Sequence, residues 1–535
     1  AQQAAVSTVT AAFAPDVFNK FRAHLLLGVT GSGKTEVYLH LVHAALEAGR
    51  QALVLVPEIN LTPQLEQTFR ARFPDTHIAI MHSALPDNER ALAWLATQRG
   101  EARIVLGTRL AVFTPMPALG LIIVDEEHDA SFKQQDGVRY SARDLAVVRA
   151  NQLHCPIVLG SATPSIESFA NAISERYLLS RLPERARANA VLPTVRLVDL
   201  RAETVTEGIA ASVLVALRDC TARGEQSLVF LNRRGYAPVL ACGACGWVGD
   251  CDRCAAHLVV HLKERRLRCH HCGFDQSIPR NCPTCGNVDL VPFGRGTQRV
   301  EDTLALALPE ARVLRIDSDS MRAKDRWRTT IDSIHAGEVD VLVGTQILAK
   351  GHDFPRLTLV AILNADAALM AADYRAPERL FAQLHQVAGR AGRADLRGEV
   401  LIQTQYPEHP TYRALVKGDY EAFAHVQLEE RTQAGFPPAV SEAVIRAEAA
   451  AIADALRFLQ GALADAPARP GGLTIYDPVA MSLSRLAGWE RAHVLIQARS
   501  RKALQGFLAA WTAQLYERRT PTGVRWHVEV DPIEF

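Results

Sequence analysis

The chain has 535 residues, of which 48% are hydrophobic, 22% charged and 6% aromatic. These proportions are typical of folded globular proteins, so they exclude intrinsic disorder over the whole chain. Its 59 lysines and arginines are balanced by 58 aspartates and glutamates, so a nucleic acid must be bound by local basic clusters. The length predicts roughly three to four domains. The longest apolar runs stop far short of the roughly 20 residues of a membrane span, so we expect no membrane partner.

Short apolar runs alternate with longer amphipathic stretches in the first third of the chain. Continuous apolar strands separated by helices predict a parallel sheet that is covered on both faces. We therefore assign residues 1–180 to a first α/β lobe. Its expected strands are 24–27, 52–56, 78–81, 103–106, 121–124 and 157–159.

A second series of apolar runs predicts a second α/β lobe over residues 181–436. Eight of the ten cysteines fall between Cys242 and Cys285, in a segment that interrupts this lobe just after its expected first strand. Because the βα pattern resumes near Gly294, residues 240–290 are predicted to be an insertion. The strands expected in this lobe are 227–231, 313–316, 341–343, 359–362 and 399–402.

The last segment, residues 437–535, predicts an α+β domain. Its elements follow the order βαββαβ, which is the ferredoxin-like arrangement. The fold by itself does not indicate a role for this domain. The expected strands are 441–449, 473–477, 492–498 and 524–530, and the expected helices are 451–464 and 501–517.

Residues 28–35 read Gly-Val-Thr-Gly-Ser-Gly-Lys-Thr, which matches the phosphate-loop (Walker A) pattern. An accidental glycine loop is disfavoured, because an expected strand precedes the motif and an expected helix follows it. Lys34 is predicted to reach the β- and γ-phosphates of ATP, and Thr35 to ligate Mg²⁺. The predicted ATP-binding residues from this motif are Gly28, Thr30, Gly31, Ser32, Gly33, Lys34 and Thr35.

An acidic motif, Asp125-Glu126-Glu127-His128, follows the expected strand at 121–124. Parallel sheets place their ligands at the carboxyl ends of strands. Asp125 is predicted to hold Mg²⁺, and Glu126 to orient and deprotonate the attacking water. A solvated acidic turn is the alternative for the motif, and His128 is equally compatible with an ordinary hydrogen-bonded residue.

A basic motif at 386–393 places Gln386, Arg390 and Arg393 at helical spacing i, i+4 and i+7. Two arginines on one helix face are predicted to stabilise the charge of the leaving phosphates, as arginine fingers do. A basic, solvated helix face is the alternative interpretation of this motif when it is taken alone.

Several further motifs resemble those of superfamily 2 helicases, namely residues 107–109, 160–164 and 344–354. Within that superfamily the chain resembles the PriA family of replication-restart helicases over nearly its whole length. The resemblance rests on residues 28–38, 56–59, 61–64, 125–130, 231–235 and 531–534, and on the eight clustered cysteines.

The resemblance implies two RecA-like lobes, a two-zinc insertion in the second lobe, and a C-terminal α+β domain. It also implies an ATP-dependent DNA helicase that moves 3′ to 5′ and restarts stalled replication forks through primosome assembly. The implied partners are single-stranded and forked DNA, primosome proteins and single-stranded DNA-binding protein, in the bacterial cytoplasm at the nucleoid. The family's N-terminal DNA-binding domains are expected to be missing, because the helicase motifs begin almost at Ala1.

Further site residues are carried over from the family motifs. Gln2 or Gln3 corresponds to a glutamine that reads adenine. The loop at 137–144 resembles an aromatic-rich loop, but it has Val138 where the family usually has tryptophan. Stacking on a base contributes ~1–3 kcal/mol, so we expect weaker coupling between DNA and ATP. The expected DNA-contacting or coupling residues are Arg109, Arg139, Tyr140, Ser161, Thr163, Thr345 and Lys350.

The clustered cysteines form four Cys-x-x-Cys pairs, a spacing that brings two thiolates to one tetrahedral Zn²⁺. Four pairs predict two closed Cys₄ sites with a structural role, whereas redox disulfides or incidental thiols are the disfavoured alternatives. Spacing leaves the connectivity open. The family resemblance implies nesting, with the outer pairs sharing one zinc and the inner pairs the other. From the N-terminal side the pairs are Cys242/Cys245, Cys251/Cys254, Cys269/Cys272 and Cys282/Cys285.

An alternative function remains open from the sequence. The chain is also compatible with a replication-restart scaffold that has a weak or idle motor and binds DNA and partners through its zinc module and C-terminal domain. The intact Lys34, Asp125 and Glu126 favour the enzyme, whereas Val138 favours weak coupling. An RNA helicase or nuclease-linked translocase is disfavoured, because no nuclease constellation is recognisable in the sequence.

Overall fold

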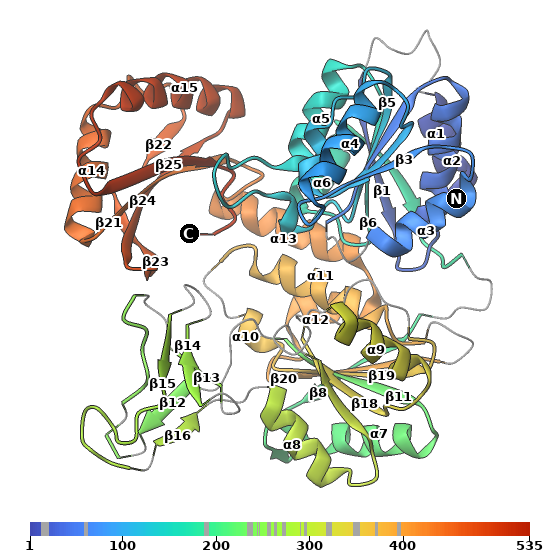
Figure 1. Ribbon diagram of the computed structural model, residues 1–535, viewed down its shortest axis with the longest axis vertical. Coiled ribbons are helices and arrows are strands. Elements are labelled where there is room, and N and C mark those ends of the chain that lie inside the picture. The colour runs from blue at the N-terminus through green and yellow to red at the C-terminus, as the bar shows by residue number, and fades with distance from the viewer. Residues whose placement is uncertain are drawn as a thin grey trace.

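The computed structural model arranges the chain as two parallel-sheet lobes, a small cysteine-rich module and a C-terminal α+β domain (Figure 1). Among the described residues, no helix is both long and apolar enough to cross a membrane. The structure describes all residues except 12–20, 58–61, 187–191, 233–238, 243, 246, 254–257, 262–264, 270–273, 289, 294–296, 317–323, 346–353, 370–372, 393–396 and 535.

Lobe 1 is a seven-stranded parallel sheet in the order β3-β4-β2-β5-β6-β1-β7. Apolar clusters cover both faces of the sheet, as its continuous apolar strands predict. Six strands confirm the predicted runs, and β7 was not expected. The strands are β1 (Ala23–Gly28), β2 (Gln51–Leu55), β3 (Ile78–Met81), β4 (Ile104–Gly107), β5 (Leu119–Asp125), β6 (Ile157–Ser161) and β7 (Tyr177–Leu182). The helices are α1 (Gln2–Thr10), α2 (Lys34–Glu47), α3 (Thr62–Arg72), α4 (Asp87–Gln98), α5 (Ala142–Gln152) and α6 (Ile166–Ile173).

Lobe 2 is a six-stranded parallel sheet in the order β17-β18-β11-β19-β20-β8. Its strand β8 precedes the expected first strand, so the cysteine-rich insertion follows the second strand of the sheet, which corrects the prediction. The strands are β8 (Thr194–Asp199), β11 (Gln226–Leu231), β17 (Val313–Ile316), β18 (Val341–Gly344), β19 (Leu357–Leu363) and β20 (Glu399–Thr404), with a ribbon of β9 (Val205–Thr206) and β10 (Ile209–Ala210). The helices are α7 (Ala211–Ala222), α8 (Thr297–Ala307), α9 (Lys324–His335), α10 (Asp366–Leu369), α11 (Ala376–Ala388), α12 (Pro410–Lys417) and α13 (Tyr420–Ala434).

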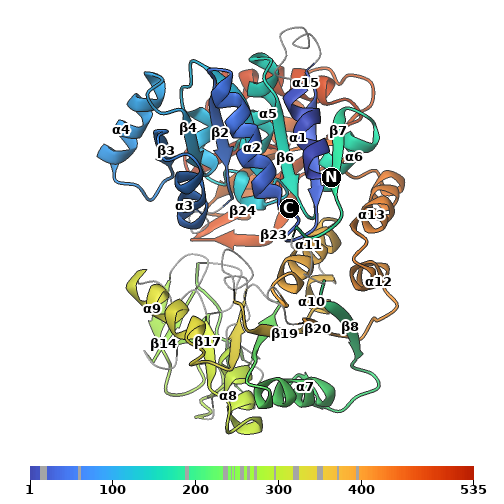
Figure 2. The same ribbon diagram turned by 90° about the vertical axis from the view of Figure 1, so that its right-hand side faces the viewer.

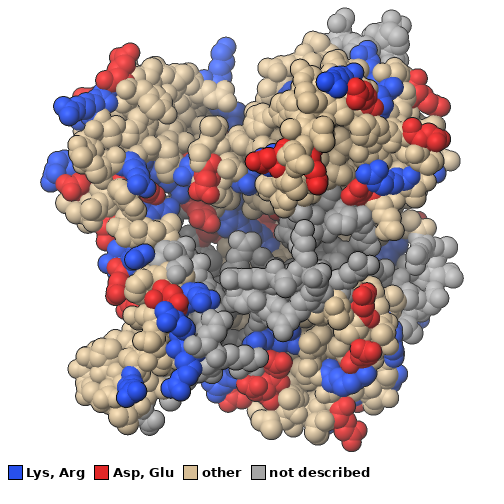
Figure 3. All heavy atoms as spheres, in the orientation of Figure 1, with Lys and Arg blue, Asp and Glu red and all other residues tan. Residues whose placement is uncertain are grey.

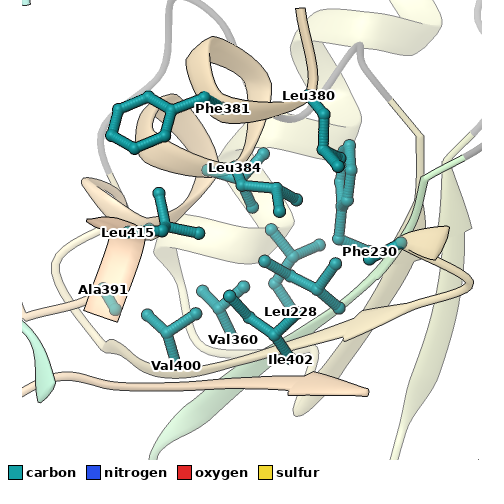
Figure 4. Packing of buried hydrophobic residues seen from close by; sticks show 14 of the residues in the cluster. Leu228, Phe230, Val360, Leu380, Phe381, Leu384, Ala391, Val400, Ile402 and Leu415 are labelled. Carbon is teal, nitrogen blue, oxygen red and sulfur yellow. The ribbon is translucent and has the colours of Figure 1, made fainter. Parts of the chain in front are cut away.

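Helix α11 packs on the lobe 2 sheet through an apolar stripe, in which Leu380 and Leu384 lie above strand residues such as Val360 (Figure 4). The i, i+4 spacing of these leucines keeps them on one face of the helix. The same core also buries Ile166 and Phe169 of α6, so the two lobes share one apolar cluster.

Polar contacts join the lobes beside this shared core, where α11 lies between them (Figure 2). The Glu378 carboxylate, in the first turn of α11, accepts a hydrogen bond from the Ile166 backbone amide of lobe 1 (3.0 Å). Its other oxygen accepts from the buried Arg431 guanidinium (2.6 Å). The Tyr420 hydroxyl donates to the Pro164 carbonyl (2.6 Å). Lobe 2 therefore caps the N-terminus of α6.

The cysteine-rich module is a five-stranded antiparallel sheet in the order β15-β14-β13-β12-β16. Its apolar core is small and centres on Leu240, Leu258, Val260 and Leu267. The module contacts the C-terminal domain, because the Gly488 amide donates to the Arg253 carbonyl (2.7 Å). Its strands are β12 (Val239–Cys242), β13 (Val259–His261), β14 (Arg266–Arg268), β15 (Asp275–Ser277) and β16 (Leu290–Phe293).

The C-terminal domain is an antiparallel sheet in the order β22-β24-β21-β25, with β23 paired to β24. The elements follow the predicted βαββαβ order, and β23 is an additional strand that was not expected. The two helices cover one face through a core that includes Phe458 and Trp511. The elements are β21 (Ser441–Ala449), α14 (Ile452–Ala464), β22 (Leu473–Ile475), β23 (Val479–Leu486), β24 (Trp489–Ala498), α15 (Arg501–Glu517) and β25 (Val524–Val530).

The segment that follows β25 bridges the C-terminal domain and lobe 2. The Pro532 carbonyl accepts a hydrogen bond from Arg375 (3.1 Å), and the Ile533 carbonyl accepts one from Arg379 (2.6 Å). Lys133 of lobe 1 donates to the carbonyl of Val530, the last residue of β25. The C-terminal domain is thereby fixed to both lobes.

Candidate functional site

The phosphate loop connects β1 to α2, as the motif predicts. Gly33 has a φ of +82°, a left-handed conformation that favours glycine, and it is the residue directly before α2. The Lys34 ammonium folds back over the loop and donates to the Gly28 carbonyl (3.0 Å). The backbone amides at the start of α2 and the Lys34 ammonium therefore gather positive charge at one point, which suits a phosphate.

Helix α1 supports the loop from outside. The Gln2 side-chain amide donates to the Ser32 carbonyl (2.7 Å). A Cβ atom at position 33 would lie 2.2 Å from Gln2 Nε2, so the approach of Gln2 also needs the glycine. The structure thus places Gln2 against the phosphate loop, while a role in reading adenine stays a prediction.

The acidic motif begins at the carboxyl end of β5. The Asp125 Oδ1 atom accepts a hydrogen bond from the Tyr38 hydroxyl of α2 (2.8 Å). Burial raises the pKa of Asp125 to about 6, and the neighbouring Glu126 carboxylate adds to this rise, while Lys34 opposes it. Glu126, with a φ of +47°, turns the chain directly after the strand.

Glu127, the third residue of the acidic motif, is buried. Its carboxylate accepts hydrogen bonds from the Ser165 amide (2.6 Å) and the Ser168 hydroxyl (2.9 Å). Arg143 pairs with the same carboxylate (3.2 Å). Its neighbour His128 contacts the Ser161 hydroxyl through Nδ1 (2.8 Å). The acidic motif is therefore bonded directly to the 160–164 motif and to the start of α6.

A cavity of about 320 Å³ brings three separated motifs together. The phosphate loop and the acidic motif lie on its lobe 1 side, and Gln386 and Arg390 lie on its lobe 2 side. A hydroxyl and a carboxylate at Thr35 and Asp125 are the hard oxygen ligands that Mg²⁺ prefers. The lining residues are Thr30, Gly31, Ser32, Gly33, Lys34, Thr35, Asp125, Glu126, Gln386 and Arg390.

The basic motif is not one helix face, which corrects the prediction. Helix α11 ends at Ala388, and Arg390 lies in the turn that follows. At Gly389 an added Cβ atom would lie 2.8 Å from the Thr30 side chain of the phosphate loop. The two lobes can approach this closely because residue 389 is a glycine. Arg390 reaches the cavity from a turn and not from the helix. Arg393 lies outside the described residues.

Two residues beside the cavity were not found from the sequence. Burial lowers the pKa of His385 to about 4, and the nearby Lys34 ammonium lowers it further. Arg185, which follows β7, donates to the Gly392 carbonyl of lobe 2 (3.1 Å). Neither residue belongs to a recognisable motif, and both depend on contacts between segments that are distant in the sequence.

Most of the expected DNA-contacting or coupling residues lie outside this cavity. Arg109 donates to the carbonyls of Ser131 (2.9 Å) and Lys133 (3.0 Å), in the loop that follows the acidic motif. Tyr140 packs edge-on against Phe113, with ring centroids 4.8 Å apart. The structure thereby links Arg109 to the acidic motif through the intervening loop.

The other residues of this expected set are placed as follows. The Ser161 hydroxyl accepts a hydrogen bond from the Thr163 amide (2.9 Å). Arg139 and Thr345 are partly buried, and Val138 is 80% exposed. Lys350 lies outside the described residues.

The outer cysteine pairs meet in space. The sulfur atoms of Cys242, Cys245, Cys282 and Cys285 all lie within 4.8 Å of one another. Four such sulfurs fit a tetrahedral Zn²⁺ site.

The inner pairs are only partly described. Cys251 and Cys269 are buried in the module core, while Cys254 and Cys272 lie outside the described residues. The sharing of a second zinc by these pairs therefore stays a prediction.

Family models match four parts of the chain. Residues 1–172 match the DEAD/DEAH box helicase model, and residues 289–395 match the helicase conserved C-terminal domain. Residues 251–276 match the PriA DNA helicase Cys-rich region, and residues 432–533 match the primosomal protein N C-terminal domain. The two lobes are thus RecA-like helicase lobes, and the module is the zinc-binding insertion.

The chain is similar to replication restart proteins along most of its length. It is 44% identical to Replication restart protein PriA of Haemophilus influenzae, over 96% of this chain and 70% of that protein. The protein of the same name from Bacillus subtilis is 42% identical over 78% of this chain, which spans about half (52%) of that relative. A solved structure of RecG bound to a three-way DNA junction is similar with a TM-score of 0.47 and 18% identity, over 82% of this chain and 47% of that chain. The chain belongs to the PriA family of replication restart proteins, and its lobes are the helicase domains of that family.

Proposed function

We propose that this chain is an ATP-hydrolysing DNA translocase that moves 3′ to 5′ on single-stranded DNA. In this proposal it restarts stalled replication forks by primosome assembly. The observation that carries the proposal is the cavity between the lobes, where the phosphate loop, the acidic motif and Arg390 meet. A site lined by residues of both lobes is complete only when the lobes are together, so its chemistry depends on their relative position.

Each lining residue has a specific role in this proposal. Lys34 binds the β- and γ-phosphates, and Glu126 orients the attacking water and takes its proton. Mg²⁺, held by Thr35 and Asp125, would neutralise charge on the phosphate oxygens. Arg390 stabilises the negative charge that develops on the leaving phosphates. Arg393 is proposed to share this role.

Coupling to DNA follows from the bonds around the acidic motif. Glu127 is hydrogen-bonded to the Ser165 amide, at the end of the segment that carries Ser161 and Thr163. Arg109 is bonded to the loop that follows the acidic motif. We propose that a shift of either segment on DNA reaches Glu126 through Glu127 and through the loop that follows the motif. We propose that Arg109, Arg139, Tyr140, Thr345 and Lys350 complete the DNA-contacting set.

The cysteine module and the C-terminal domain are proposed to hold DNA and partner proteins. Figure 3 shows Lys and Arg side chains on the module and on the facing part of the C-terminal domain, with Asp and Glu side chains among them. In a chain whose net charge is only +1, DNA phosphates would be contacted by such local lysines and arginines. We propose two structural Zn²⁺ ions, with forked DNA, primosome proteins and single-stranded DNA-binding protein as partners in the bacterial cytoplasm.

The second candidate function is a restart scaffold with a weak or idle motor. The specific observation in its favour is Val138, an exposed aliphatic residue in the loop where the family resemblance predicts a tryptophan. A smaller stacking surface predicts weaker stimulation of the ATPase by DNA. The binding surfaces of the scaffold would be the same module and C-terminal domain.

The rate of ATP hydrolysis should be measured in the presence of single-stranded DNA, forked DNA or RNA. Each nucleic acid should be added at the same concentration of nucleotide residues. We expect DNA to stimulate turnover and RNA to do so much less. Replacing Val138 with tryptophan should increase the stimulation by DNA without changing basal turnover. DNA binding with no turnover under any of these conditions would favour the scaffold and exclude the motor.

A further inference from the structure

Tyr38 is a fully buried side chain that reaches the acidic motif from the phosphate-loop helix. It lies four residues after Lys34 in α2, and its side chain is 1% exposed. Its hydroxyl is 2.8 Å from Asp125 Oδ1. A carboxylate oxygen can only accept a hydrogen bond, so the Tyr38 hydroxyl is the donor.

The neighbouring strand leaves space for this hydroxyl. Gly160 of β6 is the direct partner of Asp125 in the parallel register between β5 and β6. A Cβ atom at position 160 would lie only 1.7 Å from the Tyr38 hydroxyl oxygen. Any side chain at this position would therefore push the hydroxyl away from Asp125, and the strand accommodates the contact only because residue 160 is glycine.

We propose that Tyr38 is a positioning residue that fixes the Asp125 carboxylate for metal-bound nucleotide. Rotation of a carboxylate about its last bond is broad, and a hydrogen bond from a rigid donor restricts this rotation. The donor is rigid because the tyrosine ring is buried in the core of lobe 1. One helix thus positions both the lysine that binds phosphate and the carboxylate that holds Mg²⁺. This inference rests on the proposed ATPase function.

Tyr38→Phe removes the hydroxyl and keeps the buried ring. Binding of a non-hydrolysable ATP analogue should be measured by titration with Mg²⁺ and, separately, in EDTA. We expect the Mg²⁺ concentration for half-maximal binding to rise roughly 10-fold, as for loss of a hydrogen bond to a charged group. Affinity in EDTA should stay unchanged, because the phosphate loop and Lys34 are intact.

Tyr412→Phe is the matched control. Its ring is also fully buried, and its hydroxyl donates to the carboxylate of Asp366 (2.7 Å), in lobe 2 and away from the cavity. This variant should lose comparable stability and keep the Mg²⁺ requirement of the natural chain. Thermal unfolding of both variants checks that each is folded.

The outcomes separate this inference from the proposed function. An unchanged Mg²⁺ requirement in folded Tyr38→Phe overturns the positioning role, as does an equal loss of affinity in EDTA. If Tyr38→Phe fails to fold, a Gly160→Ala variant displaces the hydroxyl instead, and its Mg²⁺ requirement decides in the same way. A natural chain that binds no nucleotide in either condition would overturn both the ATPase proposal and this inference.

Discussion

The cavity between the lobes and the cysteine module are built in opposite ways. The cavity lies at the carboxyl ends of parallel strands, above two buried apolar clusters, and its polar groups are fixed by protein contacts such as Tyr38 to Asp125. The module has five strands of three or four residues each and a small apolar core. Its four gathered sulfurs could hold a metal ion, which would join the two outer cysteine pairs.

This difference predicts which property each site loses on substitution. Groups in the cavity are held by a core that does not depend on them, so their removal should change the chemistry and leave the fold. In the module, zinc bound by the gathered cysteines would supply much of the folding free energy, because a structural zinc site and its fold form together. Their removal should change the fold locally and leave the chemistry of the cavity.

Lys34→Ala is expected to have the largest effect on chemistry. Loss of the charge proposed to contact the transferred phosphate should abolish measurable ATP turnover. The fold should persist, because the loop is shaped by its glycines and by α1. Steady-state ATPase assays and circular dichroism melting check both points. Lys417→Ala, at an exposed position in the last turn of α12, is the control. Retained DNA-stimulated turnover in the folded Lys34→Ala protein would exclude the assignment of the active site.

Arg390→Ala tests the lobe 2 side of the same cavity. An arginine finger acts on charge that develops in the transition state, so we expect kcat to fall ~10³-fold with little change in nucleotide affinity. Arg390→Lys should restore only part of the rate, since lysine keeps the charge but lacks the planar fork of donors.

The matched control for Arg390→Ala is Arg196→Ala, also in lobe 2. Its partner is Glu399, and this exposed pair should contribute little to stability. Weakened nucleotide binding with unchanged kcat in Arg390→Ala would show a ground-state contact and contradict the proposed role.

The sequence predicted an element correctly wherever the residues of one continuous segment determine that element. Fully buried strands such as β5 read as continuous apolar runs, and the phosphate loop needs only local glycines and the next helix. The edge strands β7 and β8 were missed because both are only partly buried and their apolar runs are interrupted by polar residues. Strand β23 also mixes polar and apolar residues.

Contacts between distant segments could not be predicted from the sequence. Tyr38 and Asp125 are 87 positions apart, and only the strand order places them together. The end of α11 was missed for a related reason. Gly389 lies close to Thr30 of the other lobe, and this approach, rather than helical spacing, sets the position of Arg390.

The double substitution Cys282→Ser and Cys285→Ser tests the module. One of the two proposed zinc ions should be lost, with about 10 kcal/mol of local folding free energy. Metal analysis should then give one zinc per chain, and hydrogen exchange should increase over the module. Basal ATP turnover should be largely retained, while unwinding or partner assembly should be impaired.

Cys155→Ala is the control for this experiment, because Cys155 is buried in lobe 1 and is not part of the cysteine cluster. Its zinc content should equal that of the natural chain. Loss of basal turnover together with zinc in the double variant would contradict the separation between the two sites. A natural chain with disulfides in place of zinc would overturn the metal assignment.

Substitution of His385 is expected to give the smallest effect. It tests whether this buried residue makes the folded state less stable at acidic pH. The residue is buried where the lobes meet, and the charged groups that influence it are Lys34, Glu126, His128 and Arg185. Its pKa of about 4 lies below the usual value near 6.5, so the folded state holds the neutral ring. Below pH 6.5 the unfolded chain gains a proton that the folded chain does not. The contribution of this residue to the free energy of unfolding is therefore fully present above about pH 6.5, and it decreases as the pH falls towards 4.

At pH 5 this single group should cost about 2 kcal/mol of the free energy of unfolding relative to pH 7.5. His385→Gln keeps a polar side chain of similar length but removes the titration, so the difference in stability between the two pH values should shrink by that amount. Urea unfolding followed by circular dichroism measures it, and the lobes should unfold together because they share one apolar cluster. His43→Gln, at an exposed site on α2, should leave the difference as it is. An unaltered pH dependence in His385→Gln would show that acid acts on the cavity through other groups.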